Sequence, residues 1–238
     1  MCEQNRDAQS SGCPDDVGVD WNEQTRVGLE TALNEAEVVG LRIALSDSAC
    51  ELLLHVCAQS EQVAKDPDPR RVLRLLRATR IRVLLREDRQ DGYGPAIPLA
   101  GLDDVESFFT SLGGWEAMYG WEFLDRPSRT GDWPEKPSLT VDLRPGRSSH
   151  SLFWFTECWR PDDDARYCIE GTVDFDDLEV LRADGAHEPV EEFVAEGRRW
   201  WDVLFGLSGQ PPQAQVTPAE APSWREHRRG TTFFGDER

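Results

Sequence analysis

Two long runs of alternating apolar and polar residues constrain the fold more than any other feature of the sequence. They are RVLRLLRATRIRVLLRE (71–87) and YCIEGTVDFDDLEVL (167–181). Alternation with a period of two predicts β-strands. In both runs the alternation changes phase, so that the apolar residues move from odd to even positions or from even to odd. In the first run they change from Leu76 and Ala78 to Ile81 and Val83. In the second they change from Val173 and Phe175 to Leu178 and Val180. A β-bulge produces such a change, so we expect the strands to bend near Thr79 and Asp176.

The other elements occur in the same order in both halves of the chain. A helix from Asp20 to about Ala36 precedes strand-like runs at 38–45 and 50–57, the first long run, and a helix with apolar residues from Leu102 to Leu112. The second half has runs at 138–143 and 151–158, the second long run, and a helix after Pro189. This order predicts an α+β fold of antiparallel sheets with helices, in which two tandem βββα units pack as one compact body.

The composition along the chain divides it into five segments. We expect a disordered amino terminus (1–18), a first αβββα unit (19–125), a linker (126–137), a second βββα unit (138–208) and a flexible carboxyl-terminal tail (209–238).

The two halves also align residue by residue. An offset of 97 residues aligns Ile81 with Leu178 and Val83 with Val180, and an offset of 85 aligns Phe108 with Phe193. An internal duplication with a pseudo-two-fold axis explains these matches. The alternative stays open, because any two βββα units align this well when the offsets are chosen freely.

The segment HSLFWFTECW (150–159) is interpreted as a core strand. Leu152, Trp154, Thr156 and Cys158 share one face, and Phe153 and Phe155 share the other. The turn RPDDDAR predicts a hairpin with the following strand. A hairpin centred on Asp163 places Cys158 opposite Cys168 and Phe155 opposite Gly171. We expect both cysteines to be free thiols that fill space in the core.

Charge and composition exclude several classes of function. The formal net charge of −19 argues against a nucleic-acid binder, because phosphate attraction requires a basic surface. No apolar run approaches the roughly 20 residues of a membrane helix, and the amino terminus lacks the pattern of a signal peptide. We therefore expect a cytoplasmic protein with reduced cysteines, and no membrane or nucleic-acid partner.

Sequence motifs for catalysis and metal binding are missing. The chain contains no CxxC, HxxxH, GxSxG, HExxH, GxGxxG or Walker-type pattern. We therefore expect neither a cofactor nor a metal, and no catalytic residue can be named.

Arginines on the first long run provide the candidate binding residues. The 97-residue offset aligns Arg77 with Asp174, Arg80 with Asp177 and Arg82 with Glu179, so three matched positions carry opposite charges. Either the two halves face each other through these strands, with arginine against carboxylate, or the arginines meet an acidic partner or ligand. A solvated strand face remains a third explanation.

Several segments resemble hypothetical proteins of high-GC bacteria. These segments are MYGWEFLD, SLTVDLRPG, HSLFWFTEC, YCIEGTVDFDDLEVLRADG and EEFVAEGRRWWD, and the resemblance covers about residues 20–206. It implies no activity and no site residue, since none is assigned in that group. The βββ pattern is also distantly similar to β-rich immunity proteins that neutralise bacterial toxins.

Taken together, these features favour a non-enzymatic protein-interaction module, toxin-neutralising or regulatory, whose partner is another protein. The alternative is an enzyme or small-ligand binder with a pocket between the halves, lined by Trp and Arg.

Overall fold

The computed structural model describes residues 19–44, 48–59, 68–112, 114–116, 120–125, 136–160 and 165–207. The expected disordered amino terminus and flexible tail, and nearly all of the expected linker, lie outside these residues.

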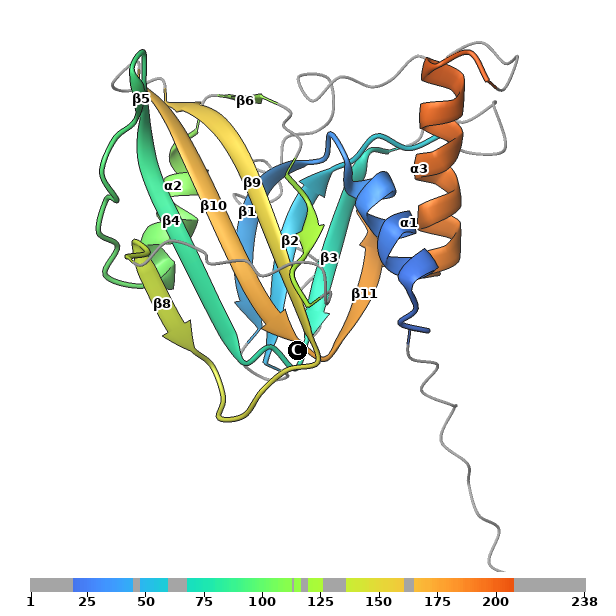
Figure 1. The fold of residues 1–238 in the computed structure, drawn as a ribbon, viewed down its shortest axis with the longest axis horizontal. Coiled ribbons are helices and arrows are strands. Elements are labelled where there is room, and N and C mark those ends of the chain that lie inside the picture. Colours follow the sequence, from blue (N-terminus) through green and yellow to red (C-terminus); the bar gives the residue numbers. More distant parts are fainter. Residues whose placement is uncertain are drawn as a thin grey trace, which may run out of the picture.

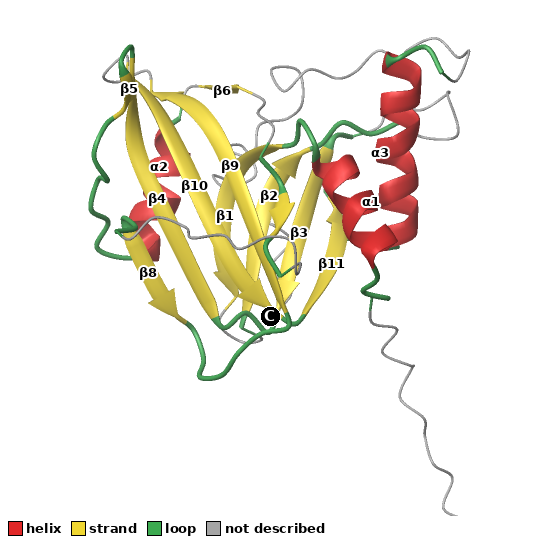
Figure 2. Ribbon diagram, in the orientation of Figure 1, coloured by secondary structure: helices red, strands yellow, loops and turns green. Residues whose placement is uncertain are grey.

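Two antiparallel sheets and three helices make up the described part of the chain, which confirms the α+β class (Figures 1 and 2). The first sheet has the order β1-β2-β3-β11-β12 and the second the order β5-β4-β10-β9-β6, with β7 beside β9 and β8 beside β4. Strands of the first sheet are β1 (Glu37–Ala44), β2 (Ala49–His55), β3 (Arg70–Leu76), β11 (Asp177–Arg182) and β12 (His187–Glu188). Strands of the second are β4 (Arg80–Arg89), β5 (Gly92–Tyr93), β6 (Gly114–Glu116), β7 (Glu122–Phe123), β8 (Leu139–Asp142), β9 (His150–Arg160) and β10 (Ala165–Phe175).

Each long run passes from one sheet to the other. The first run forms β3 in one sheet and β4 in the other, and the second forms β10 and β11. The breaks lie at residues 77–79 and at Asp176, where the sequence predicted bends. Each change of phase therefore marks the point at which the chain leaves one sheet and enters the other. The expected bulge within a single strand is wrong.

The two runs pair with each other on both sides of the break. β3 pairs with β11 and β4 with β10, both antiparallel, and the four strands converge in Figure 1. Backbone hydrogen bonds close the gap, from Thr79 N to Asp174 O (2.8 Å) and from Asp176 N to Leu76 O (3.1 Å). Arg77 adopts a left-handed backbone with φ of 51°, which lets the chain turn sharply here. We call this region, residues 77–79 and 174–177, the crossing.

The expected duplication is not confirmed. The inner strands occupy equivalent positions, since β2-β3-β11 in one sheet corresponds to β9-β10-β4 in the other. The first strands do not, because β1 lies beside β2 whereas β8 pairs with β4 and not with β9. Each sheet also combines strands from both halves of the chain.

Three helices complete the core. α2 (Leu102–Ser111) packs against β1, and its Phe108 and Phe109 meet Tyr167 and Trp154 of the second sheet, so this helix contacts both sheets. α1 (Glu23–Leu33) and α3 (Val190–Leu204) lie side by side at the opposite end of the molecule in Figure 1. Gly197 allows their close approach, because a Cβ there would lie 2.5 Å from Ala32 Cα.

The ends of α1 differ from the helix predicted between Asp20 and about Ala36. Asn22 is the N-cap, and its Oδ1 accepts a hydrogen bond from Thr25 N at 2.9 Å. Asp20 supports this cap from outside, by accepting a hydrogen bond from Asn22 Nδ2. The helix therefore begins at Glu23 and ends at Leu33.

The predicted hairpin is formed by β9 and β10, one residue out of the expected register. Cys158 pairs with Tyr167, Cys168 with Glu157, and Trp154 with Gly171. The two thiols consequently lie on opposite faces of the sheet, and the predicted pairs Cys158–Cys168 and Phe155–Gly171 are wrong. The interpretation as a core strand holds for one face, where Leu152, Trp154, Thr156 and Cys158 are all buried, whereas Phe153 and Phe155 on the other face are only partly buried.

Among the described residues, no helix is both long enough and apolar enough to cross a lipid bilayer.

The Trp154–Gly171 pair provides a test of the observed register. Trp154 is fully buried, and a Cβ on Gly171 would lie 2.3 Å from its indole ring. Gly171→Ala should therefore lower the free energy of unfolding by about 3 kcal/mol, because the core has no room for an added methyl group. Urea denaturation measures this value. Gly101→Ala is the control, since nothing lies within 4 Å of a Cβ there, and it should cost less than about 1 kcal/mol. Equal effects of the two substitutions would contradict the packing described.

Candidate functional site

A polar pocket of about 890 Å³ opens beside the crossing. Both halves of the chain contribute to it: Thr79 and Arg80 come from the start of β4, and Asp174 comes from the end of β10. The loop 143–149 between β8 and β9, together with Asp125, Asp142, His150 and Ser151, forms the rest of the lining. We call this the crossing pocket.

The loop 143–149 is attached at both ends to the crossing. Arg144 Nη2 donates to Asp176 Oδ2 at 2.5 Å and to Arg77 O at 2.6 Å. At the other end, Ser149 N donates to Asp176 Oδ1 at 3.1 Å. A single carboxylate therefore fixes both ends of the loop, and Gly146 turns its tip with φ of +122°.

Two of the six predicted binding residues line the crossing pocket. Arg80 and Asp174 are directly opposed in the β4–β10 register. Arg80 Nε forms its ion pair with Asp142 of β8, at 2.7 Å. Arg77 and Asp177 lie at the crossing itself, where their side chains approach to 3.7 Å. Arginine thus faces carboxylate across the two runs, as one of the sequence interpretations expected.

The remaining two predicted residues lie away from the pocket and from each other. Arg82 Nε donates to Thr172 Oγ1 at 3.0 Å. Glu179 accepts a hydrogen bond from Arg74 Nη1 at 2.7 Å, and Arg74 also pairs with Glu51. The sequence alignment missed Arg74 because it compared positions along the chain and not positions across the antiparallel ladder.

His150 is one of the pocket residues that the sequence did not single out as a binding residue. Its Nδ1 lies 3.1 Å from Asp125 Oδ2 and 3.2 Å from Arg26 Nη2, and Arg26 also pairs with Asp125 at 3.0 Å. Trp21 stacks on the imidazole with ring centroids 4.0 Å apart. Segments from three distant parts of the sequence meet at His150, and no local sequence motif indicates this group of residues.

The carboxyl group of Asp125 is held in its ionised form. Burial alone would raise its pKa, but hydrogen bonds from His150, the amide of Ser151 and Arg26 outweigh burial and lower the pKa from 3.8 to about 2. Asp125 therefore orients the imidazole ring and fixes the segment before β9.

The crossing pocket is suited to binding polar groups. Within the described part of the chain, no serine or threonine hydroxyl forms a hydrogen bond with His150, and the Thr79 and Ser148 hydroxyls bond each other at 2.8 Å. An activated hydroxyl nucleophile would require a base within hydrogen-bonding distance. The arrangement offers guanidinium, carboxylate, imidazole and hydroxyl groups to a bound molecule.

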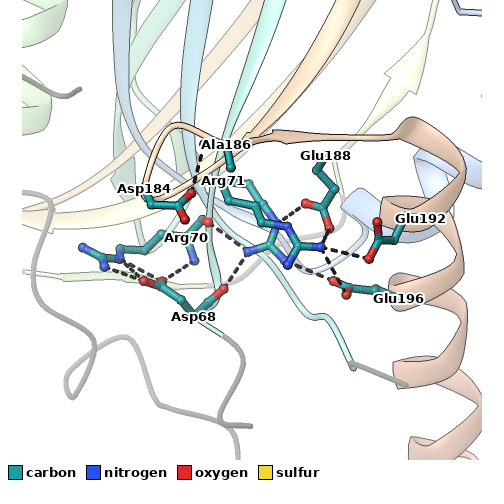
Figure 3. A network of polar contacts seen from close by, with 9 residues as sticks. Asp68, Arg70, Arg71, Asp184, Ala186, Glu188, Glu192 and Glu196 are labelled. Atoms are coloured by element: carbon teal, nitrogen blue, oxygen red, sulfur yellow. Dashed lines mark hydrogen bonds and ion pairs between the residues drawn. The ribbon is translucent and has the colours of Figure 1, made fainter. Parts of the chain in front are cut away.

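A second polar cluster is buried between β3, β12 and α3 (Figure 3). Arg71 donates to Glu188 at 2.5 Å and to Glu196 at 3.1 Å, and its Nη1 donates to the carbonyl oxygens of Asp68 and Arg70. Arg182 pairs with the other oxygen of Glu188 at 3.0 Å and with Glu192 at 3.0 Å. All three side chains of the Arg71–Glu188–Glu196 cluster are at most 5% exposed.

This cluster fastens α3 to the first sheet. Oxygens of Glu188, Glu192 and Glu196 lie within 4.8 Å of one another, a spacing that could hold a metal ion. The two arginines already occupy these carboxylates, so a cation would have to displace them. The pKa of Glu196 is raised, first by burial and then by the charge of Glu188. We therefore assign the cluster a structural role.

The described cysteines are free thiols, as expected. They are Cys50, Cys57, Cys158 and Cys168. Burial raises the pKa of Cys57 and of Cys158 to about 12, and it also raises the pKa of Cys50 and of Cys168. A thiol with such a pKa carries almost no thiolate at neutral pH, so these residues are unsuited to nucleophilic catalysis.

No protein-family model matches the chain, and searches of curated proteins and of solved structures found no match.

Asp125 makes the stability of the protein depend on acidic pH. Its pKa is lower in the folded state, so its contribution is complete above pH 4 and is lost as the pH falls towards 2. Asp125→Asn should cost about 1–2 kcal/mol at pH 6, and this cost should shrink between pH 4 and pH 2. Denaturation at several pH values measures it. Asp103→Asn, an exposed carboxylate on α2, is the control. A cost for Asp125→Asn that does not change with pH would contradict this role.

Arg71 provides the test of the buried cluster. Arg71→Met leaves Glu188 and Glu196 buried without their shared guanidinium and should cost about 3–5 kcal/mol. Arg89→Met, which removes an exposed pair with Glu87, should cost less than about 1 kcal/mol. Denaturation of both variants compares them, and a loss of similar size in each would show that the cluster does not fasten α3.

Proposed function

We propose that the protein is a non-enzymatic, cytoplasmic protein-interaction module that binds a basic partner protein. The observation that supports this proposal is an exposed apolar surface at the carboxyl end of α3. Leu204, Phe205 and Leu207 are 55%, 67% and 74% exposed. Apolar side chains that gather on a surface commonly mark a binding site for another protein. We call these three residues the α3 patch.

Aromatic packing holds the α3 patch in place. Phe205 stacks on Trp201 with ring centroids 5.6 Å apart, and Trp200 meets Trp201 edge to face. Trp201 Nε1 donates to Thr31 O of α1 at 3.0 Å, which fixes the indole to the body of the protein. Rigid aromatic anchors lose little entropy on binding, and such residues are frequent among binding hot spots.

Net charge favours one class of partner. With a net charge of −19, the protein attracts positively charged proteins over long range and repels acidic ones. A basic partner with an apolar contact group therefore fits both the α3 patch and the acidic body. Neutralisation of a basic toxin, or regulation of a basic protein, is the role we propose.

A second candidate function is supported by the crossing pocket. Its volume of about 890 Å³ lies within the range of small-molecule sites, and it is formed between the two halves of the chain. The alternative interpretation of the sequence expected a lining of Trp and Arg; the pocket is lined by arginines and carboxylates and by no tryptophan. This pocket favours a small-ligand binder.

Affinity capture from a native cytoplasmic extract tests the first proposal. The wild-type chain should retain one basic protein in stoichiometric amount, identified by mass spectrometry. The double variant Leu204→Ser/Phe205→Ser should lose it, because the apolar contact is removed without disturbing the core. Val27→Ser is the matched control, since Val27 of α1 is also exposed, and it should retain the partner.

Raising the salt concentration should weaken capture, since screening reduces the long-range attraction. Retention of the same partner by the double variant, or capture of an acidic protein only, would contradict the proposal.

A further inference from the structure

We infer that the crossing pocket binds a small molecule that carries an oxyanion, of the phosphate or carboxylate type, on a body rich in hydroxyl groups. This inference rests on the second candidate function, the small-ligand binder, and is independent of the α3 patch.

Arg147 is the main cation that the pocket offers. It lies at the tip of the loop 143–149, whose two ends Asp176 holds through Arg144 and Ser149. Its side chain is exposed, and it forms no ion pair or hydrogen bond within the described part of the chain. A guanidinium group binds an oxyanion through two parallel hydrogen bonds, so Arg147 is available for a ligand.

Arg80 provides a second, exchangeable cation. Its ion pair with Asp142 joins side chains that are 51% and 66% exposed. Exposed pairs contribute little to stability, so an incoming oxyanion can compete with Asp142 for the guanidinium at small cost. Two of the arginines that line the pocket, Arg147 and Arg80, are thus available to an anionic ligand.

Uncharged polar groups beside these arginines suit the same ligand. Nδ1 of His150 donates to the carboxylate of Asp125, so the other ring nitrogen, Nε2, accepts a hydrogen bond from a ligand hydroxyl. The Thr79 and Ser148 hydroxyls, which bond each other, also line the pocket. These hydroxyls bind either an oxyanion or an alcohol, whereas the imidazole Nε2 binds an alcohol.

Asp174 determines what the rest of the ligand must be. It lines the pocket opposite Arg80, with which it interacts electrostatically, and its carboxylate forms no hydrogen bond or close ion pair with a described residue. Asp125 is paired with Arg26, whereas Asp142 loses its partner when a ligand takes Arg80. Asp174 and Asp142 therefore repel a bare anion but accept hydrogen bonds from hydroxyl groups, which favours an anionic polyol over a free inorganic ion.

Isothermal titration calorimetry of the full chain at constant ionic strength tests this inference. The probes are glucose 6-phosphate, gluconate, inorganic phosphate and glucose. Glucose 6-phosphate or gluconate should bind saturably, and the stronger of the two identifies the oxyanion. Inorganic phosphate should bind more weakly than the better polyol, and glucose should not bind.

Variants test the assigned roles. Arg147→Gln should weaken binding of the better polyol about ten-fold or more, because hydrogen bonds to an ionised partner are lost. Arg89→Gln is the matched control, since Arg89 is as exposed as Arg80 but lies at the far end of β4, and binding should stay unchanged.

Asp174→Asn should bind inorganic phosphate more tightly than the wild type does. The α3 variant Leu204→Ser/Phe205→Ser should keep full polyol binding, which separates this test from the proposed protein interaction.

Three results would overturn the inference. These are no saturable binding of either anionic polyol, equal losses in Arg147→Gln and Arg89→Gln, or weaker phosphate binding by Asp174→Asn.

Discussion

The rest of the structure depends on the pairing of two chain segments, 70–89 and 165–182, each of which forms one strand in each sheet. Because β3 pairs with β11 and β4 with β10, the same two segments form the centre of one sheet and then of the other. Neither sheet is complete without the segment that also builds its neighbour. The helices reinforce this arrangement: α2 contacts both sheets, and the buried Arg71–Glu188–Glu196 cluster attaches α3 to the first sheet.

The position of the crossing was predictable from the sequence, but its nature was not. Alternation records which face of a strand is buried, so a change of phase locates a break near Thr79 and Asp176. Alternation does not record which sheet a strand belongs to. The hairpin shows the same limit: β9 was predicted as a core strand and one of its faces is buried, yet the register was one residue out because polar turn residues do not fix the centre of a turn.

The candidate site was largely hidden in the sequence for a related reason. Arg80 and Asp174 were selected by their charges, and the structure places them opposite each other. Asp125, His150, Arg144 and Arg147 come from loops and strand ends, where no periodicity operates. Their grouping depends on long-range contacts, such as Arg26 with Asp125 and Arg144 with Asp176. The paired strands of the crossing and these contacts bring the loops together, so the pocket is a consequence of the fold.

Native-state hydrogen exchange tests the central claim, that the paired strands make both sheets one cooperative unit. The amides to compare are those of β3 and β11 in the first sheet and of β4 and β10 in the second. If the crossing joins the sheets, these four strands should open together, with one free energy equal to that of global unfolding and one dependence on denaturant. A lower opening free energy for β4 and β10 than for β3 and β11, or the reverse, would show that the sheets unfold separately and would contradict the claim.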